Sequence, residues 1–171
     1  MTKLQGIEEL NEVFNDFFAM LGYEEIECEL NIDFSYYYGA DIITYTLFEN
    51  PLSDIGFMTY IHNTFKNVPP CSTMVLSLLH ELGHHITMPS IKRKKWLKCK
   101  KDKHRLEKIK ANTNKARIEK QIKYSSLFDE YIATKKAIEI LNNNYDLILS
   151  FESVWYDAVM EFYKKNNVIN A

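Results

Sequence analysis

The chain has 171 residues, a length that suits one domain, and 46% of them are hydrophobic, which is ample for a buried core. It has no charged and then apolar leader and no apolar run of membrane-spanning length, so we do not expect an integral membrane protein. The three cysteines, Cys28, Cys71 and Cys99, look unpaired, so we expect a single domain, residues 1–171, in the reducing cytoplasm.

The first third of the chain predicts a helix followed by a small sheet. An amphipathic stripe from Ile7 to Leu21 predicts the helix. The stretch from Tyr23 to Phe34 alternates in part, and Asp41 to Glu49 is rich in Ile, Thr and Tyr. We expect these to be two strands joined by a turn at Ser35 to Ala40. Ile55 to Ile61 predicts either a third strand or a short helix.

An HExxH motif at His80 to His84 is the most informative feature of the chain. On a helix, His80 and His84 lie about 40° apart on one side, and the apolar residues gather on the roughly opposite side. These apolar residues are Val75, Leu78, Leu79, Leu82 and Ile86. The division suits a metal site, because the apolar face anchors the helix while the other face presents two imidazoles one turn apart. Ser72 or Thr73 is expected to cap this helix, which should end near Pro89.

Glu81 lies beside the first histidine and is the candidate general base. Its carboxylate could take a proton from the attacking water and pass it to a leaving amine. Gly83 leaves room for a close neighbour, and His85 is expected to be exposed or to support a ligand rather than to bind metal. The alternative, a buried helix with incidental polar residues, leaves two histidines and a glutamate at metal spacing unexplained.

A catalytic zinc site needs a third protein ligand and an open position, and HExxH classes differ in where that ligand lies. Metzincins have Gly and His at the third and sixth positions after the second histidine; this chain has Thr87 and Ser90 there, which excludes that class. A peptide deformylase needs an upstream cysteine in its own motif, and neither Cys28 nor Cys71 has such surroundings. The remaining large class, the gluzincins, takes a glutamate from a second helix downstream.

The stretch from Ser125 to Leu141 predicts such a helix, with Ser126 and Asp129 as a start similar to a capping box. Glu130 falls in its first turn and shares a face with three small residues, Ala133, Thr134 and Ala137. A face of small residues lets this helix pack closely against the HExxH helix, as a third ligand requires. Asp129 is the adjacent alternative, although the helix dipole alone also favours an acid in a first turn. Weaker candidates are His104, Glu107 and Glu119.

The HELGH sequence at His80 to His84, followed by Glu130-x-x-Ala133-Thr134-x-x-Ala137, resembles the ImmA/IrrE-type metallopeptidases of phages and mobile elements, within the gluzincins. The resemblance covers roughly Met74 to Leu141. It implies zinc ligands at His80, His84 and Glu130, a general base at Glu81, and cleavage of one regulatory protein such as a repressor. The chain departs from the pattern at Thr134, where gluzincins often carry Asp or Asn to orient a ligand histidine, and in the long separation of His84 from Glu130.

A basic segment at about residues 91–124 fills that separation. Between Lys92 and Lys123 there are 15 Lys and Arg against Asp102, Glu107 and Glu119, a formal charge of +12 that leaves −14 on the other residues. Its few apolar residues predict one or two helices that project as an arm or hairpin. This charge suits nucleic acid phosphates or an acidic protein, or is a solvated face. With Trp96 as the only aromatic residue between Lys92 and Lys123, binding through phosphates is favoured over base reading.

The final stretch, Tyr145 to Lys164, predicts an amphipathic core helix. We therefore expect an α+β, zincin-like fold in which a small antiparallel or mixed sheet packs on the HExxH helix and further helices, with the basic segment as an insertion. The predicted function is Zn²⁺-dependent hydrolysis of a peptide bond in a specific, regulatory protein.

Two other functions remain open from the sequence. One is a zincin-like binding module that acts through the basic segment on nucleic acid or an acidic protein, and the other is a zinc hydrolase of a non-peptide amide. A catalytic site of this kind usually has a further donor to the oxyanion, and the sequence does not choose among Tyr124, Tyr131 and Tyr156.

Overall fold

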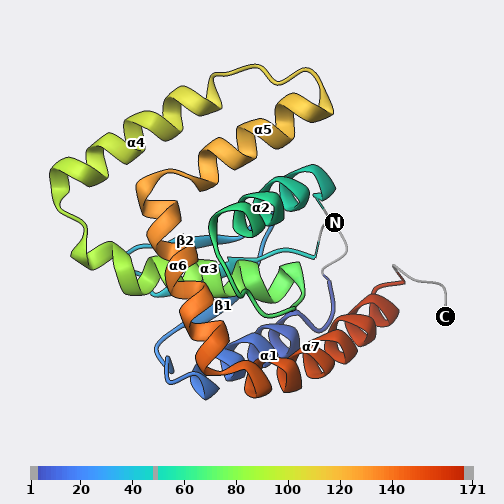
Figure 1. The fold of residues 1–171 in the computed structure, drawn as a ribbon. Coiled ribbons are helices and arrows are strands. Elements are labelled where there is room, and N and C mark those ends of the chain that lie inside the picture. The colour runs from blue at the N-terminus through green and yellow to red at the C-terminus, as the bar shows by residue number, and fades with distance from the viewer. Residues whose placement is uncertain (1–3, 48–49, 168–171) are drawn as a thin grey trace. The chain divides into compact units, whose positions relative to one another are not determined.

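The computed structural model describes residues 4–47 and 50–167, and in these it contains seven α-helices and three strands, which confirms an α+β fold (Figure 1). The elements belong to two compact units. One contains α1, the three strands and α7, and the other contains α2 to α6. None of the helices in the described part of the chain has the length and apolar composition of a membrane span.

In the first unit, α1 (Ile7–Met20) and α7 (Tyr145–Lys165) confirm the two predicted amphipathic helices. Their apolar faces meet through aromatic side chains, with Phe17 stacked on Phe151 at 4.0 Å between ring centroids. Phe14 meets Phe151 edge to face at 5.9 Å and lies 4.0 Å from the ring of Tyr45. These rings are buried and form part of the apolar core of this unit.

The first unit also contains a mixed sheet in the order β1-β3-β2. Its strands are β1 (Glu27–Leu30), β2 (Ser35–Tyr37) and β3 (Ile42–Tyr45). β1 runs parallel to β3, and β2 runs antiparallel to β3. The turn predicted at Ser35 to Ala40 is therefore wrong: parallel strands cannot be joined by a tight turn, and the connecting residues form β2 instead. Residues 48–49 of the second predicted strand lie outside the described residues.

Two asparagines of α1 bind the backbone of β1. Asn15 Oδ1 accepts a hydrogen bond from Cys28 N at 2.6 Å, and Asn11 Oδ1 accepts one from Leu30 N at 3.2 Å. Asn11 Oδ1 also accepts from the Tyr45 hydroxyl at 2.7 Å. Side chains thus satisfy amide groups that an edge strand would otherwise leave open to pairing with another chain.

The second unit is helical. It comprises α2 (Pro51–Thr64), α3 (Thr73–Thr87), the short 3₁₀ helix η1 (Met88–Ser90), α4 (Arg93–Glu107), α5 (Asn114–Ser125) and α6 (Phe128–Asn143). Ile55 to Ile61, expected to be a strand or a helix, lies within α2. Asn50 caps this helix by accepting from Ser53 N, and Pro51 suits its first turn because proline there sacrifices no helical hydrogen bond.

The basic segment forms the helical hairpin α4–α5, as Figure 1 shows. It does not project freely as we expected from its sparse apolar residues, because α5 packs against α2. Gly56 of α2 makes this approach possible: a Cβ there would lie 2.6 Å from Gln121 Cβ. The Ser53 hydroxyl also donates to Gln121 Oε1 at 3.2 Å. The hairpin is therefore an integral part of the second unit.

Candidate metal centre

The HExxH helix, α3, begins and ends as predicted. Ser72 caps it, accepting from Val75 N at 3.2 Å, and the helix gives way to η1 around Pro89. Near its end the Thr87 hydroxyl donates to Gly83 O at 2.7 Å. The four apolar residues Val75, Leu78, Leu79 and Leu82 are fully buried. His80, Glu81 and His84 are also buried, with 7%, 8% and 7% of their surfaces exposed, because α6 covers this side of the helix.

Helices α3 and α6 approach so closely that their backbones almost touch. A Cβ added to Gly83 would collide with Ala133 O and would lie 2.8 Å from Ala133 C. Ala133, Thr134 and Ala137 are all fully buried on α6, which is the face of small residues predicted from helical spacing. This close approach brings Glu130, at the start of the same face, to the two histidines.

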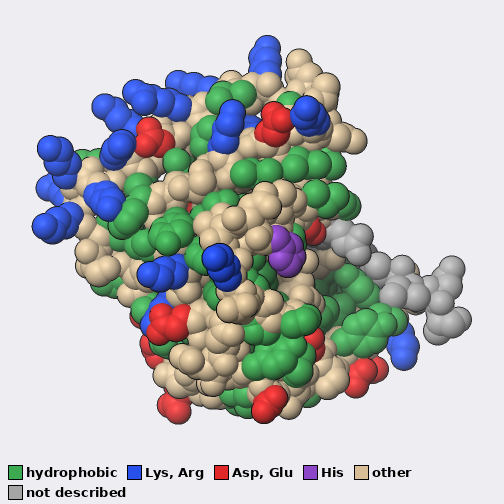
Figure 2. Space-filling model, viewed as in Figure 1, with side chains coloured by type: hydrophobic (Ala, Val, Ile, Leu, Met, Phe, Trp, Pro, Cys, Tyr) green, Lys and Arg blue, Asp and Glu red, His purple; other side chains and the backbone are tan. Residues whose placement is uncertain are grey.

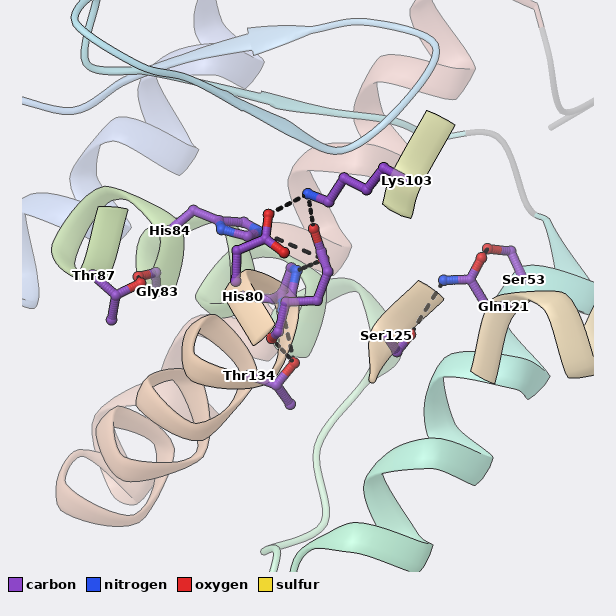
Figure 3. A network of polar contacts seen from close by, with 11 residues as sticks. Ser53, His80, Gly83, His84, Thr87, Lys103, Gln121, Ser125 and Thr134 are labelled. Carbon is purple, nitrogen blue, oxygen red and sulfur yellow. Dashed lines mark hydrogen bonds and ion pairs between the residues drawn. The ribbon is translucent and has the colours of Figure 1, made fainter. Parts of the chain in front are cut away.

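Three potential ligand atoms converge between α3 and α6. Donor atoms of His80, His84 and Glu130 all lie within 4.8 Å of one another, and all three residues are buried. Glu130 Oε2 is 2.9 Å from His80 Nε2 and 3.4 Å from His84 Nε2. Figure 3 shows the two imidazoles side by side on α3, with the contacts drawn as dashed lines. The structure therefore brings together the three residues that the sequence singled out as metal ligands.

Thr134 determines which nitrogen of His80 faces the cluster. Its hydroxyl donates to Glu130 O at 2.9 Å and lies 3.0 Å from His80 Nδ1. Because the hydroxyl proton is given to a carbonyl, which can only accept, the same oxygen accepts from His80 Nδ1–H. The other nitrogen, Nε2, then carries a lone pair directed towards Glu130 Oε2.

This donor set fits a bound cation. Two lone pairs that face each other at 2.9 Å repel unless a proton or a metal ion lies between them. Ligand atoms at about 2.0–2.2 Å from a tetrahedral zinc stand roughly 3.3 Å apart, close to the two distances found here. Two neutral imidazoles and one carboxylate are also a usual zinc donor set, and three protein ligands leave one position open for a reactant.

The electrostatics of Glu130 are set by the groups around it. Burial raises its pKa, but when His80 and His84 are protonated, the hydrogen bonds that they donate and the charges of the two rings lower it more, so in the metal-free protein the pKa lies well below 4.5. Its other oxygen, Oε1, pairs with Lys103 of α4, which also contacts Asp129 Oδ2 at 2.6 Å. Burial lowers the pKa of Lys103, but the charge of Glu130 and the neighbouring groups of Tyr124 and Asp129 raise it by more. The net effect is a pKa above the usual value of 10.5. Lys103 is therefore a half-buried cation at neutral pH.

The other candidate site residues from the sequence lie outside the cluster or have other partners. Asp129, the alternative third ligand, is buried but paired with Lys103. His104 and Glu107 are 65% and 69% exposed in their side chains and lie opposite each other at 3.7 Å, and Glu119 is exposed. Among the described residues, none of these joins the three-residue cluster. Glu81 is buried on α3 and its carboxylate is not one of the converging donors; His85 is half-buried.

Two aromatic residues lie near the cluster. Phe57 of α2 packs edge to face against the His80 ring at 5.4 Å, which helps to fix the plane of that ring. Of the three tyrosines named from the sequence, Tyr124 has its ring centre 5.2 Å from Nζ of Lys103, and burial and the charge of Glu130 raise its pKa to about 12. Tyr131 is stacked on Phe65, and Tyr156 is 57% exposed on α7.

Lys103 is the residue at this site that the sequence analysis missed, because it is one of 15 basic residues in its segment. Helical spacing does contain a signal. Lys103 falls on the same side of α4 as Trp96, Cys99 and Leu106, three of the four apolar residues of that helix, and these four side chains are at least half-buried, whereas Leu97 is exposed. A lysine within an apolar stripe is a candidate for a buried ion pair.

Comparisons of the chain with protein family models, with curated proteins and with solved structures find no match.

Proposed function

We propose that the chain is a zinc-dependent metallopeptidase that hydrolyses a peptide bond in a specific, regulatory protein. The observation that supports this most directly is the convergence of His80, His84 and Glu130 on one point, with the His80 lone pair directed at the carboxylate. A structural zinc site is normally closed by four protein ligands. A site with three protein donors and an adjacent Glu81 therefore suits hydrolysis better than it suits a purely structural role.

In this proposal, His80, His84 and Glu130 would hold a zinc ion, which when bound would act as a Lewis acid towards the scissile carbonyl and the attacking water. The two histidines would serve as neutral donors, and Thr134 keeps the His80 ring in the tautomer whose Nε2 is free. Glu81 takes the proton of the attacking water and returns it to the leaving amine. Tyr124 holds its phenolic proton at neutral pH, because its pKa is raised to about 12, and is the candidate donor to the developing oxyanion.

Metal content tests the first half of the proposal. The protein is purified without added metal, and zinc is measured by plasma mass spectrometry in the wild type and in the His80→Ala and Glu130→Gln variants. We expect about one zinc per wild-type chain and a loss in both variants. Glu139→Gln is the matched control, because Glu139 is an exposed acid on the same helix that pairs with Lys136. A folded wild type that binds no zinc even when zinc is supplied would contradict the proposal.

Proteolysis tests the second half. Proteins of a host extract are compared by mass spectrometry after incubation with the wild type and with Glu81→Gln, a variant expected to retain zinc but to lose the base. We expect one or a few proteins to be cleaved by the wild type alone. If no protein is cleaved by the wild type and spared by the variant, the site is not a peptidase site, and the same comparison with small amide substrates tests a non-peptide hydrolase.

A second candidate function, binding of nucleic acid, is favoured by the surface of the α4–α5 hairpin. Thirteen of its 15 Lys and Arg residues are exposed, and Figure 2 shows basic side chains gathered over this part of the molecule. Lys94, Lys98 and Arg105 lie on the outer side of α4, opposite Cys99. We propose that this surface binds phosphates without reading sequence.

A mobility-shift titration over a range of salt concentrations tests this second candidate. Replacing Lys94, Lys98 and Arg105 by Gln should weaken binding of duplex DNA and reduce the salt slope by about 0.9 for each phosphate that the protein no longer neutralises. Lys135→Gln, which removes an exposed charge outside the basic segment, should change neither the affinity nor the slope. Absence of salt-dependent binding by the wild type at low ionic strength would rule this function out.

We further propose that the protein acts in the reducing cytoplasm. Cys28 and Cys99 are buried as thiols, the form that a reducing compartment preserves.

A further inference from the structure

The two sides of α4 differ sharply in character. The outer side carries exposed basic residues, whereas the inner side carries Cys99, which is 4% exposed, and Lys103, whose side chain is 23% exposed. The inner lysine is not solvated like the others. Its ammonium group lies beside the first turn of α6, which places a residue of the basic segment at the candidate metal centre.

Lys103 makes specific contacts there. Its Nζ is 2.6 Å from Asp129 Oδ2, pairs with Glu130 Oε1, and lies 5.2 Å from the centre of the Tyr124 ring. The ammonium of Lys103 is thus shared between two adjacent buried carboxylates, Asp129 and Glu130, and its single positive charge balances only one of their two negative charges. Figure 3 shows the lysine reaching the carboxylates from the side away from Thr134.

The two oxygens of Glu130 therefore face different partners. Oε2 faces Nε2 of both histidines, at 2.9 and 3.4 Å, and Oε1 faces the ammonium of Lys103. A carboxylate held in this way offers a metal ion only one of its oxygens. An unrestrained carboxylate can bind with both, which would fill the position that a reactant needs.

We propose that Lys103 is a positioning residue of the metal centre: it occupies Glu130 Oε1 and so keeps Glu130 a one-oxygen ligand. This inference rests on the proposed function, since it concerns the same metal site. It assigns a role to the basic segment that is separate from nucleic acid binding, because the inner side of α4 completes the site while the outer side remains exposed.

Replacement of Lys103 by Met should have two opposite effects. It frees Oε1 and removes a positive charge close to the metal, so zinc should bind about ten-fold more tightly or better. Hydrolysis should nevertheless fall about 10- to 100-fold, because the open position is lost. A lysine that merely holds α4 in place would behave differently: its removal would loosen the site and weaken zinc binding.

The experiment compares wild type, Lys103→Met, Lys103→Arg and the double variant Lys103→Met with Asp129→Asn. Zinc affinity is measured by competition with a chromophoric chelator, and coordination is followed by the visible spectrum of the cobalt-substituted protein, which weakens as coordination number rises. The double variant leaves no unpaired buried carboxylate at position 129, which guards against misfolding, and keeps the net charge of the site unchanged. Lys135→Met on α6 is the control for removal of an exposed charge.

We expect tighter zinc binding in Lys103→Met, a weakened cobalt spectrum in both Lys103→Met variants, and a wild-type spectrum in Lys103→Arg and the control. If the wild type binds metal and the Lys103→Met variants have its spectrum, or if they bind zinc more weakly, the inference is wrong while the metal centre stands. If the wild type binds neither zinc nor cobalt, the proposed function and the inference both fail.

Discussion

Thr134 Oγ1 lies 3.0 Å from His80 Nδ1, so a residue one turn after Glu130 orients the first histidine of the motif. At this position gluzincins often carry Asp or Asn, and the threonine departs from that pattern. The structure nevertheless gives it a contact with the histidine ring. A hydroxyl that has already donated its proton to Glu130 O can accept from the ring, as a carboxylate would, but without bringing a second negative charge.

Thr134→Val should therefore weaken zinc binding. Valine has nearly the same shape but cannot accept from His80 Nδ1–H, which leaves a buried donor unpaired at a cost of about 1–3 kcal/mol. Loss of such a partner typically lowers metal affinity or activity about 10- to 100-fold. Chelator competition measures the affinity, and Thr134→Ser, which retains the hydroxyl, should stay close to wild type. Equal affinities in the valine and serine variants would show that the contact does not orient the ring.

Gly83→Ala should separate α3 from α6. The added Cβ would collide with Ala133 O, and because the Cβ position is fixed by the backbone and Ala133 O is itself a backbone atom, the strain cannot be relieved by a side-chain rotation. We expect a loss of at least about 1–3 kcal/mol in the free energy of unfolding, together with weaker zinc binding as Glu130 moves away. Denaturant titration and chelator competition measure these two effects. Ser77→Ala, at a half-buried position on α3, is the control and should lose much less stability.

The metal-free protein should lose stability in acid through Glu130. The folded-state pKa of this carboxyl lies well below 4.5, so its contribution is fully present above pH 4.5 and is lost as the pH falls towards the folded-state pKa. Denaturant titrations at a series of pH values should show a steeper fall below pH 4.5 for the wild type than for Glu130→Gln. The control Glu139→Gln should follow the wild type, and parallel curves for wild type and Glu130→Gln would contradict the pKa assignment.

The three cysteines should react at different rates. Burial raises the pKa of the Cys28 and Cys99 thiols, which are 3% and 4% exposed, whereas Cys71 is half-buried. Because the thiolate is the reactive form, Ellman's reagent should label Cys71 first in the native protein and all three thiols after unfolding in guanidinium. A Cys71→Ser variant identifies the fast thiol. Rapid labelling of three thiols in the native protein would mean that the buried positions are open to solvent.

The parts of the candidate site that follow from local helical spacing could be predicted from the sequence. The period of 3.6 residues puts His80 and His84 on one side of α3 and Glu130 on the small-residue face of α6, and the structure shows these faces packed together. The cap at Ser72 followed from the same local rules. The cap proposed at Ser126 was wrong: this residue ends α5, and its hydroxyl donates to Lys123 O.

Features that depend on partners distant in the sequence could not be predicted. β1 and β3 are parallel, and β2, which has only three residues, pairs with β3. The residue pattern of each strand reveals neither pairing. Helical spacing marks Lys103 as the lysine on the apolar side of α4, but that its partner is Glu130 depends on the position of α6, which the sequence does not reveal. Helix α2 was ambiguous because its buried residues, Gly56, Tyr60 and Ile61, form no regular apolar stripe.

The contact of Gly56 with Gln121 has a practical consequence for shortening the protein. A basic hairpin between two motif helices invites deletion to obtain a smaller protein. Deletion of α4 and α5 would uncover the side of α2 that has no Cβ at position 56 and would leave Asp129 and Glu130 as adjacent buried acids without their ammonium partner. A shortened version of the protein therefore has to retain its most highly charged segment.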